Sequence, residues 1–395
     1  MTKYISLAEI AEPRGFASGP FGSNLVSKDY ADSGVPVIRG SNMLPSAVIG
    51  GEFAYVTEEK FLRDLKSNSA VSGDLIFTQR GTLGQVAVVP NGFDGPLVVS
   101  QSQMRLRVDA NRFDTRFVLA ACRSDHFKRQ IADRAITGGV PHINLGILKD
   151  LTIPALPLDQ QRAIGEVLGA LDDKIAANRR VMTVADELIR GTFKSLRQNA
   201  NTRLADVAEN RRDQAQPKEL TDSDRYVALD DFDRRCIWIQ RSKCGNEATS
   251  AKSIFQHGDT LFGKLRPYFH KVSIANGAGV CSTDVLVIRA KSVEYRWLVA
   301  AAASSDAAIE LAVSSSNGTR MPRASWKGLS DLRVPNPQSA EVRKFTEVAS
   351  AVGGRVWAAV EEVDLLTSAR DELLPLLMNG RITVKDAEQI AEAVL

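Results

Sequence analysis

Apolar residues recur at alternating steps of four and three along two long segments, which predicts two long helices with heptad seams. The offset between the seams is the same at both ends, since 345 minus 164 and 377 minus 196 both equal 181. We interpret this as an internal duplication that carries one helix twice. The first seam holds Ile164, Leu168, Leu171, Ile175, Asn178, Met182, Ala185, Ile189, Thr192 and Leu196, and the second holds Phe345, Ala349, Val352, Val356, Ala359, Val363, Leu366, Arg370, Leu373 and Leu377.

One polar residue interrupts the apolar run of each seam. Asn178 lies in the middle of the first seam, where polar residues commonly set helix register; the alternative is that it points into solvent at a loosely packed point. Arg370 lies in the second seam. Because the second helix is a copy of the first, an intramolecular pair is favoured over a homodimeric coiled coil. If the two helices pair antiparallel, Arg370 should lie near an end where water reaches it.

Shorter repeats precede each helix and predict two globular heads of strands and turns. We therefore expect an α+β fold, with two α/β domains related by internal duplication and separated by two long helices that form an intramolecular coiled coil. The expected boundaries are 1–157 for the first head, 158–200 for the first helix, 201–338 for the second head, and 339–395 for the second helix and a C-terminal tail. The repeated pairs are 72–81 with 257–266, 98–107 with 280–289, 139–141 with 320–322, and 148–154 with 329–335.

Composition places the chain among globular proteins of more than one domain. It has 395 residues, of which 44% are hydrophobic and 25% charged, as in ordinary folded proteins. We expect no membrane span, because the apolar runs fall short of the roughly 20 residues that a span needs, and no signal peptide is apparent. The four cysteines show no metal or disulfide spacing, which favours the reducing cytoplasm. Net charge is only +3, so any basic surface must be local.

Catalytic motifs are incomplete throughout the sequence. The segment 258–264 matches the first seven positions of a phosphate-binding loop, but Leu265 replaces the required Ser or Thr and Pro267 interrupts the helix that should follow. Asp172-Asp-Lys174 has an acidic-x-Lys spacing, yet a surface salt bridge is the simpler interpretation on a helix. The four histidines form no metal-binding pair. We therefore expect a non-catalytic chain without a metal or cofactor site.

Six segments carry motifs that are found together, and in this order, in one known family: 20–25, 34–42, 72–77, 153–164, 168–175 and 373–380. In them the chain resembles the specificity subunit of type I restriction-modification systems. The resemblance implies two target-recognition domains, each reading half of a split sequence in double-stranded DNA. It also implies that the two long helices lie antiparallel between these domains, as a spacer that docks two DNA adenine methyltransferase (modification) subunits. Restriction (motor and nuclease) subunits are further optional partners. S-adenosylmethionine, and ATP with magnesium, would be bound by the partner subunits. The second head departs from this pattern in having no clear counterpart of 20–24.

Candidate DNA contacts lie where strands end or glycine-rich turns expose polar side chains. Arg pairs bidentately with guanine, and Asn or Gln with adenine, while Lys, Ser and Thr suit phosphates. For each residue the alternative is an ordinary solvated side chain. The candidates are Arg39, Asn42, Gln79, Arg80, Thr82, Ser102, Gln103 and Thr137 in the first head, and Lys264, Arg266, Tyr268, Asn317, Arg320 and Arg323 in the second.

Two other function classes remain open at this stage. One is a scaffold or assembly protein, whose paired helices bind partners and whose heads bind protein or nothing. The other is a solitary methyltransferase or nuclease, which predicts turnover by the purified chain alone. Steep weakening of duplex DNA binding with salt would favour the DNA-binding interpretation, because phosphate contacts release counterions.

The helix length leads to a prediction about the spacing of the two half-sites. Residues 164–196 span about 48 Å at roughly 1.5 Å per residue, somewhat more than the 34–36 Å of a B-DNA turn. Deleting one heptad from each helix should shorten the gap between half-sites while leaving the recognised bases unchanged. A methylation-site map of that variant with an unaltered gap would contradict the role of the helices as a ruler.

Overall fold

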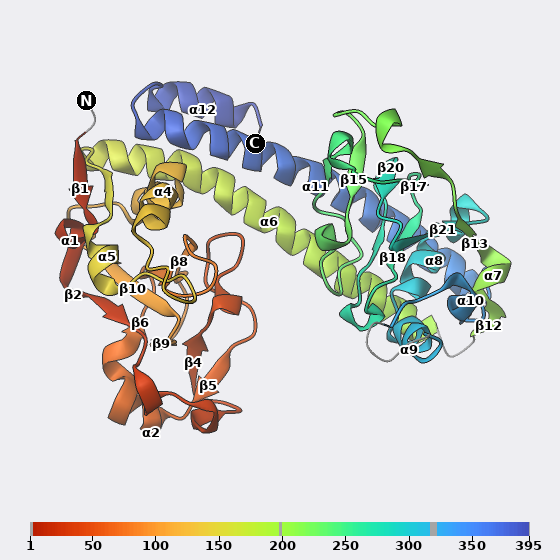
Figure 1. The fold of residues 1–395 in the computed structure, drawn as a ribbon, viewed down its shortest axis with the longest axis horizontal. Helices are drawn as coiled ribbons and strands as arrows, with labels where there is room; N and C mark the ends of the chain where they lie inside the picture. Colours follow the sequence, from red (N-terminus) through yellow and green to blue (C-terminus); the bar gives the residue numbers. More distant parts are fainter. Residues whose placement is uncertain (1–2, 197–199, 317–321, 395) are drawn as a thin grey trace. The chain divides into compact units, whose positions relative to one another are not determined.

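A computed structural model describes residues 3–196, 200–316 and 322–394, and the chain forms two compact units (Figure 1). The first unit combines residues 1–176 with 363–395, and the second is residues 177–362. Each long helix therefore contributes one half to each unit. This division differs from the sequence-based boundaries, which separate the heads from the helices.

The first unit contains a four-stranded and a five-stranded sheet. The four-stranded order is β2-β10-β7-β8, with all neighbours antiparallel, and the five-stranded order is β3-β5-β4-β9-β6, in which β4 and β9 are parallel. A further pair joins β1 to β11. The bounds are β1 Tyr4–Ser6, α1 Leu7–Ile10, β2 Ala11–Ser18, β3 Tyr30–Ala31, β4 Val35–Ile38, β5 Ala54–Val56, α2 Glu58–Lys60, β6 Ser69–Ala70, β7 Leu75–Thr78, β8 Val86–Val88, β9 Leu97–Val99, β10 Gln103–Val108, α3 Thr115–Arg123, α4 Asp125–Arg134, α5 Leu145–Asp150 and β11 Thr152–Pro154.

The second unit repeats this arrangement. Its four-stranded sheet has the order β13-β21-β18-β19, and its five-stranded sheet β14-β17-β20-β15-β16 also contains one parallel pair, β15 with β20. Four strands of this sheet correspond to β5-β4-β9-β6 of the first unit, but the fifth differs: β3 pairs with β5 in the first unit, whereas β14 pairs with β17 in the second. The predicted duplication is thus confirmed for the four-stranded sheets and for four strands of each five-stranded sheet. The bounds are β12 Ala200–Arg203, α7 Leu204–Val207, β13 Ala208–Arg211, β14 Gln214–Ala215, β15 Arg225–Val227, β16 Lys243–Cys244, β17 Lys252–Phe255, β18 Thr260–Gly263, β19 Val272–Ile274, β20 Gly279–Cys281, β21 Val285–Ala290, α8 Arg296–Ala303, α9 Asp306–Ser314, α10 Trp326–Leu329 and β22 Arg333–Pro335.

Each head encloses its own apolar core between its sheets and helices. In the first unit Ile38, Ile76 and Val99 belong to one buried cluster, and in the second Phe255 and Leu261 do so. The central strands β7 and β18 are buried along their whole length, which accounts for their nearly continuous apolar sequence. Within the described ranges, no single helix is long and apolar enough to cross a membrane, although the bent pair Val293–Ala303 with Asp306–Ser314 passes that test by length and composition.

A repeated ion pair fixes the turn that leads into each of these central strands. Asp74 accepts two hydrogen bonds of 2.7 Å from the Arg107 guanidinium and one of 2.8 Å from the backbone N–H of Val71. Asp259 does the same with Arg289, at 2.8 and 2.7 Å. The hydrogen bonds to Asp259 raise the pKa of Arg289. Both carboxylates are almost fully buried, so each depends on its arginine for compensation.

The long helices are α6 (Leu158–Leu196) and α11 (Ala340–Met378), and α12 (Val384–Glu392) follows them. In the second unit Asn178 contacts Glu362, and Phe193 lies 6.0 Å from Phe345 between ring centroids. The later residue of α6 contacts the earlier residue of α11, so the two helices run antiparallel, as predicted. Most seam residues are buried. Near the C-terminal end of α6 the buried position moves by one residue from the predicted seam, because Phe193 is buried whereas Thr192 is only half-buried.

The two polar seam residues are both accommodated by partners on the other helix. Asn178 is buried, and its Nδ2 donates to Glu362 Oε2 at 2.7 Å, which fits the predicted register role. The expectation that Arg370 reaches water is wrong: its side chain is only 13% exposed, and Nη1 donates to Asp172 Oδ1 at 2.9 Å. Asp172 also pairs with Arg123 of α3. A cation can occupy this seam position because a carboxylate of the facing helix neutralises it.

Asp259→Ala should lower the free energy of unfolding by about 3 kcal/mol, because it leaves the Arg289 charge and a turn N–H without their partner. Thermal or urea unfolding followed by circular dichroism measures this change. Asp233→Ala is the matched control: the ion pair of Asp233 with Arg241 is solvent-exposed on both sides, so its loss should leave the unfolding midpoint almost unchanged. Equal effects of the two substitutions would contradict a structural role for the Asp259–Arg289 pair.

Candidate functional site

Three loops of the first unit meet at one end of the four-stranded sheet. The turn after β7 is bonded to the turn before β10, because the backbone N–H groups of Gln79 and Arg80 donate to Ser102 O at 2.7 and 3.3 Å. A third segment joins them, since the N–H of Ile143 donates to Gln79 O at 3.1 Å. We call these three segments, residues 79–82, 100–103 and 136–143, the first loop junction.

The second unit forms the same junction with different side chains. The backbone N–H of Lys264 donates to Asp284 O at 2.7 Å, and that of Ala324 donates to Lys264 O at 2.9 Å. In addition, the N–H of Arg266 donates to Pro322 O at 3.0 Å. We call residues 264–268, 283–284 and 322–324 the second loop junction. The duplication therefore extends from the sheets to the loops that hold most of the candidate residues.

The first junction gathers most of the candidates of the first head. Gln79, Arg80 and Ser102 form its backbone hydrogen bonds, and the segment with Thr137 belongs to it. The turn with Arg39 is adjacent, because the N–H of Ser100 donates to Ile38 O at 3.1 Å. The side chains differ in exposure: Arg39, Arg80, Thr82 and Thr137 are exposed, whereas Gln79 and Ser102 are half-buried.

Two candidates of the first head, Asn42 and Gln103, point into the protein. Asn42 is fully buried, its Nδ2 donates to the carbonyls of Gly50 and Glu52 at 3.0 and 2.9 Å, and its Oδ1 accepts the N–H of Arg39 at 3.0 Å. Gln103 is also buried, and its Oε1 accepts a hydrogen bond from Ser100 Oγ. These amides order the turns beside the junction and have no free face for a ligand in this conformation.

At the second junction, one candidate side chain is half-buried and bonded to the backbone, and the other described candidates are exposed. Lys264 is half-buried, its Nζ donates to Thr283 O at 2.6 Å, and burial lowers its pKa. Arg266 and Arg323 are exposed, and Arg323 lies 3.5 Å from Asp284 across the junction. Tyr268 is 53% exposed. The remaining candidates, Asn317 and Arg320, lie outside the described residues.

Sequence reasoning missed residues that complete the first junction. Gln101 donates from Nε2 to Gly22 O and Leu25 O at 3.1 and 3.0 Å, so it ties the 20–25 loop to the junction. That loop displays Phe21, which is 76% exposed. The 20–25 motif can be found in the sequence. The exposure of Phe21 cannot, because an aromatic residue in a sequence is by default expected in the core.

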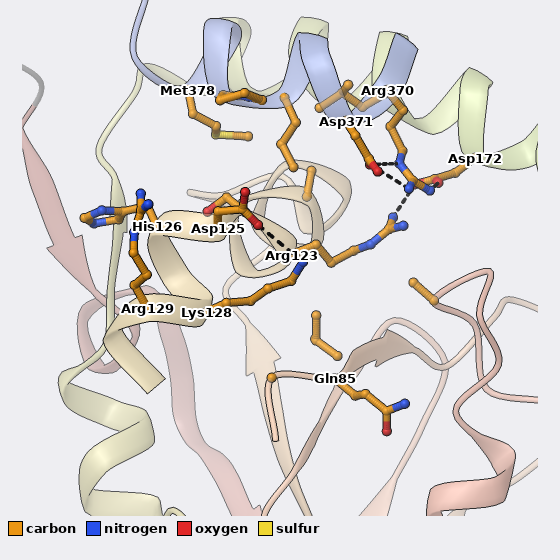
Figure 2. A pocket seen from close by; sticks show the side chains of 18 of the residues that line it. Gln85, Arg123, Asp125, His126, Lys128, Arg129, Asp172, Arg370, Asp371 and Met378 are labelled. Atoms are coloured by element: carbon orange, nitrogen blue, oxygen red, sulfur yellow. Dashed lines mark hydrogen bonds and ion pairs between the residues drawn. The ribbon is translucent and has the colours of Figure 1, made fainter. Parts of the chain in front are cut away.

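A separate pocket of about 620 Å³ lies within the first unit, lined by α3, α4 and the adjoining ends of α6 and α11 (Figure 2). The ion pairs of Asp172 with Arg123 and Arg370 form one wall. Another lining residue, Asp125, lies 3.6 Å from Lys128. No candidate residue that the structure describes lines this pocket. In the described ranges, no group of three or more His, Cys, Asp or Glu side chains could hold a metal ion.

Comparisons with known proteins give a consistent family. Residues 19–183 match the model of the "Type I restriction modification DNA specificity domain". The chain is 29% identical over 147 residues to the EcoDI specificity subunit of Escherichia coli, covering 35% of this chain and 31% of that protein. It is 20% identical over 281 residues to the MjaVIII specificity subunit of Methanocaldococcus jannaschii, covering 63% and 66%. The chain thus spans less than a third of the first relative and less than two thirds of the second.

A solved structure shares the fold over nearly the whole chain. The crystal structure of the type I restriction-modification system S subunit from M. genitalium superposes with a TM-score of 0.58, at 14% identity, over 95% of this chain and 96% of that one. At this identity the likeness concerns the fold, and it agrees with two sheet-containing domains and long helices.

Asn42→Ala should destabilise the first unit by roughly 2–3 kcal/mol, because three hydrogen bonds are lost and two carbonyls and an N–H lose their partners. Unfolding by urea measures the change, and hydrogen exchange at the Arg39 amide should accelerate. Ser41→Ala, at the exposed neighbouring position, is the control and should have little effect. A stable Asn42→Ala variant with unchanged exchange would show that Asn42 does not order this turn.

Proposed function

We propose that this chain is a type I restriction-modification specificity subunit and serves as the sequence-specific DNA-binding component of such a system. Each unit would read one half of a bipartite target. The observation that supports this most directly is the duplicated loop junction, which occurs once in each unit and carries exposed cationic and polar side chains in both.

The exposed residues at the junctions have the chemistry that base and phosphate contacts require. Arg39 and Arg80 in the first unit, and Arg266 and Arg323 in the second, carry planar guanidinium groups that suit guanine or phosphate. The side chains of Thr82 and Thr137 suit phosphate oxygens. Backbone hydrogen bonds hold the loops, so the side chains are free for readout. The buried Asn42 and Gln103 would then act through loop geometry and not by direct contact.

Catalysis and cofactor binding would belong to partner subunits. Two modification subunits would bind the helices and heads, supply S-adenosylmethionine, and flip an adenine out of the duplex in each half-site, since base chemistry requires extrusion from the stack. Restriction subunits that use ATP and magnesium would add cleavage of unmethylated DNA. In this scheme the chain selects DNA and presents it, and the cytoplasm is its place of action.

Binding to duplex DNA distinguishes this proposal from a scaffold role. Several phosphate contacts predict a steep loss of affinity as salt rises, which equilibrium titrations at several salt concentrations would measure. A flat response, or no binding, would favour the scaffold. The scaffold alternative gives no reason for two matching junctions with exposed guanidinium groups.

Arg80→Ala and Arg266→Ala should each weaken binding to the recognised duplex by about 1–3 kcal/mol if the arginine reads a base, with relaxed specificity in one half-site only. Equal weakening on all duplexes would instead identify a phosphate contact. The matched controls are Arg63→Ala in the first unit and Arg203→Ala in the second, because both arginines are exposed but lie outside the junctions. If the controls lose as much affinity as the junction variants, the junctions are not the DNA-binding surface.

A further inference from the structure

The second junction continues into an unusual loop at residues 266–270. Its two ends, Arg266 and His270, have left-handed backbones with φ of 49° and 55°, and between them Pro267–Phe269 forms a single 3-10 turn. Side chains with a Cβ rarely adopt this conformation, so surrounding contacts must impose it. Two such residues within five positions indicate a loop that is held in one shape.

Hydrogen bonds on both sides account for that shape. The backbone N–H of Phe269 donates to Arg266 O, and that of His270 donates to Pro267 O, both at 2.8 Å. The N–H of Arg266 is bonded to the junction through Pro322 O, and the N–H of Arg235 donates to His270 O at 3.0 Å. The loop is therefore anchored at both ends to other segments of the second unit.

Helix α6 braces the far end of the loop. The His270 side chain is buried, and its Nε2 lies 2.6 Å from Ser304 O. A carbonyl oxygen only accepts, so Nε2 carries the proton in this contact. Arg190 of α6 donates from Nη1 to the same carbonyl at 2.7 Å, and its Nε donates to Asp186 at 2.6 Å. The loop thus rests on the part of the helix that belongs to its own unit.

The loop presents one aromatic ring, Tyr268, in cationic surroundings. Tyr268 is 53% exposed, and its ring packs edge-on against Phe269 with centroids 5.0 Å apart. The Phe269 ring is covered in turn by the guanidinium groups of Arg234 and Arg266, at 4.1 and 5.9 Å from its centroid. The Tyr268 ring, on a loop held in one shape and next to a ring that two guanidinium groups cover, offers stacking surface with charges nearby for neighbouring phosphates.

We propose that Tyr268 stacks on a base within the half-site read by the second unit, inserting at a base step that it partly unstacks. This inference rests on the proposed DNA-binding function and assigns a specific contact to the second junction. Flexible pyrimidine–purine steps open at the lowest cost, so such a step is the expected site. A loop that is already held in one shape loses little conformational entropy on binding, which favours insertion of the ring that it carries. The 20–25 loop of the first unit displays Phe21 from a different position, so the two heads would differ in this contact.

The test uses the full chain and duplexes that it selects from a random library. Tyr268→Ala should weaken binding about 5- to 150-fold, the range for loss of one base–aromatic stack, and should reduce sequence preference in one half-site only. Tyr268→Phe keeps the ring and should bind within about twofold of the natural chain. In duplexes with 2-aminopurine at successive steps of that half-site, the natural chain and Tyr268→Phe should change the fluorescence at one step, and Tyr268→Ala should not.

Two further variants separate stacking from simpler explanations. Tyr268→Leu keeps an apolar side chain without a ring; if it binds as well as the natural chain, the contact is a non-aromatic one, such as a thymine methyl group, and the proposal is overturned. Val293→Ala alters an exposed apolar residue beyond the other end of β21 and should leave binding and fluorescence unchanged. All variants should share one thermal midpoint, since Tyr268 is half-exposed.

The outcomes distinguish this inference from the function on which it rests. If the natural chain binds duplex DNA with a steep salt dependence but Tyr268→Ala binds equally well, the stacking contact is absent and DNA binding stands. If the natural chain does not bind duplex DNA at all, the proposed function fails and the inference fails with it.

Discussion

The antiparallel packing of α6 against α11 is the interaction on which both compact units depend. Each unit contains one half of each helix, so neither head has its complete core without both helices. The seam is mainly apolar, and its two polar members are paired across the helices, Asn178 with Glu362 and Arg370 with Asp172. Such pairing avoids the cost of burying an isolated polar or charged group. It also favours one register of α6 against α11.

The duplicated junctions explain how two heads with one architecture can carry different recognition chemistry. The hydrogen bonds that join the loops use backbone groups, so they do not depend on which side chain each position carries. Gln79 of the first unit corresponds to Lys264 of the second, and Ser102 corresponds to Asp284, in the same hydrogen-bond pattern. The side chains can therefore diverge while the loop geometry is retained, as the proposed reading of two different half-sites requires.

Sequence patterns placed the candidate residues at strand ends and glycine turns, but they could not predict the direction of the side chains. Strand ends and glycine turns indicate where a chain bends, and the turns of Arg80 and Arg266 do meet other predicted loops in their junctions. Burial of Asn42 could not be predicted, because it depends on the carbonyls of Gly50 and Glu52, which approach only when the loop closes. Phe21 was missed for the opposite reason: its exposure follows from the anchoring of its loop by the distant Gln101.

The sequence by itself determined the two long helices and the duplication of the heads. These features follow from local periodicity and from repeats that can be aligned by residue number, and both are properties of order along the chain. Only the tertiary structure decided which polar residues are buried, how the loops meet and where Tyr268 is presented. Those outcomes depend on partners far apart in the sequence, such as Asp172 for Arg370 and Ser304 for His270, and no local pattern encodes the meeting of two such residues.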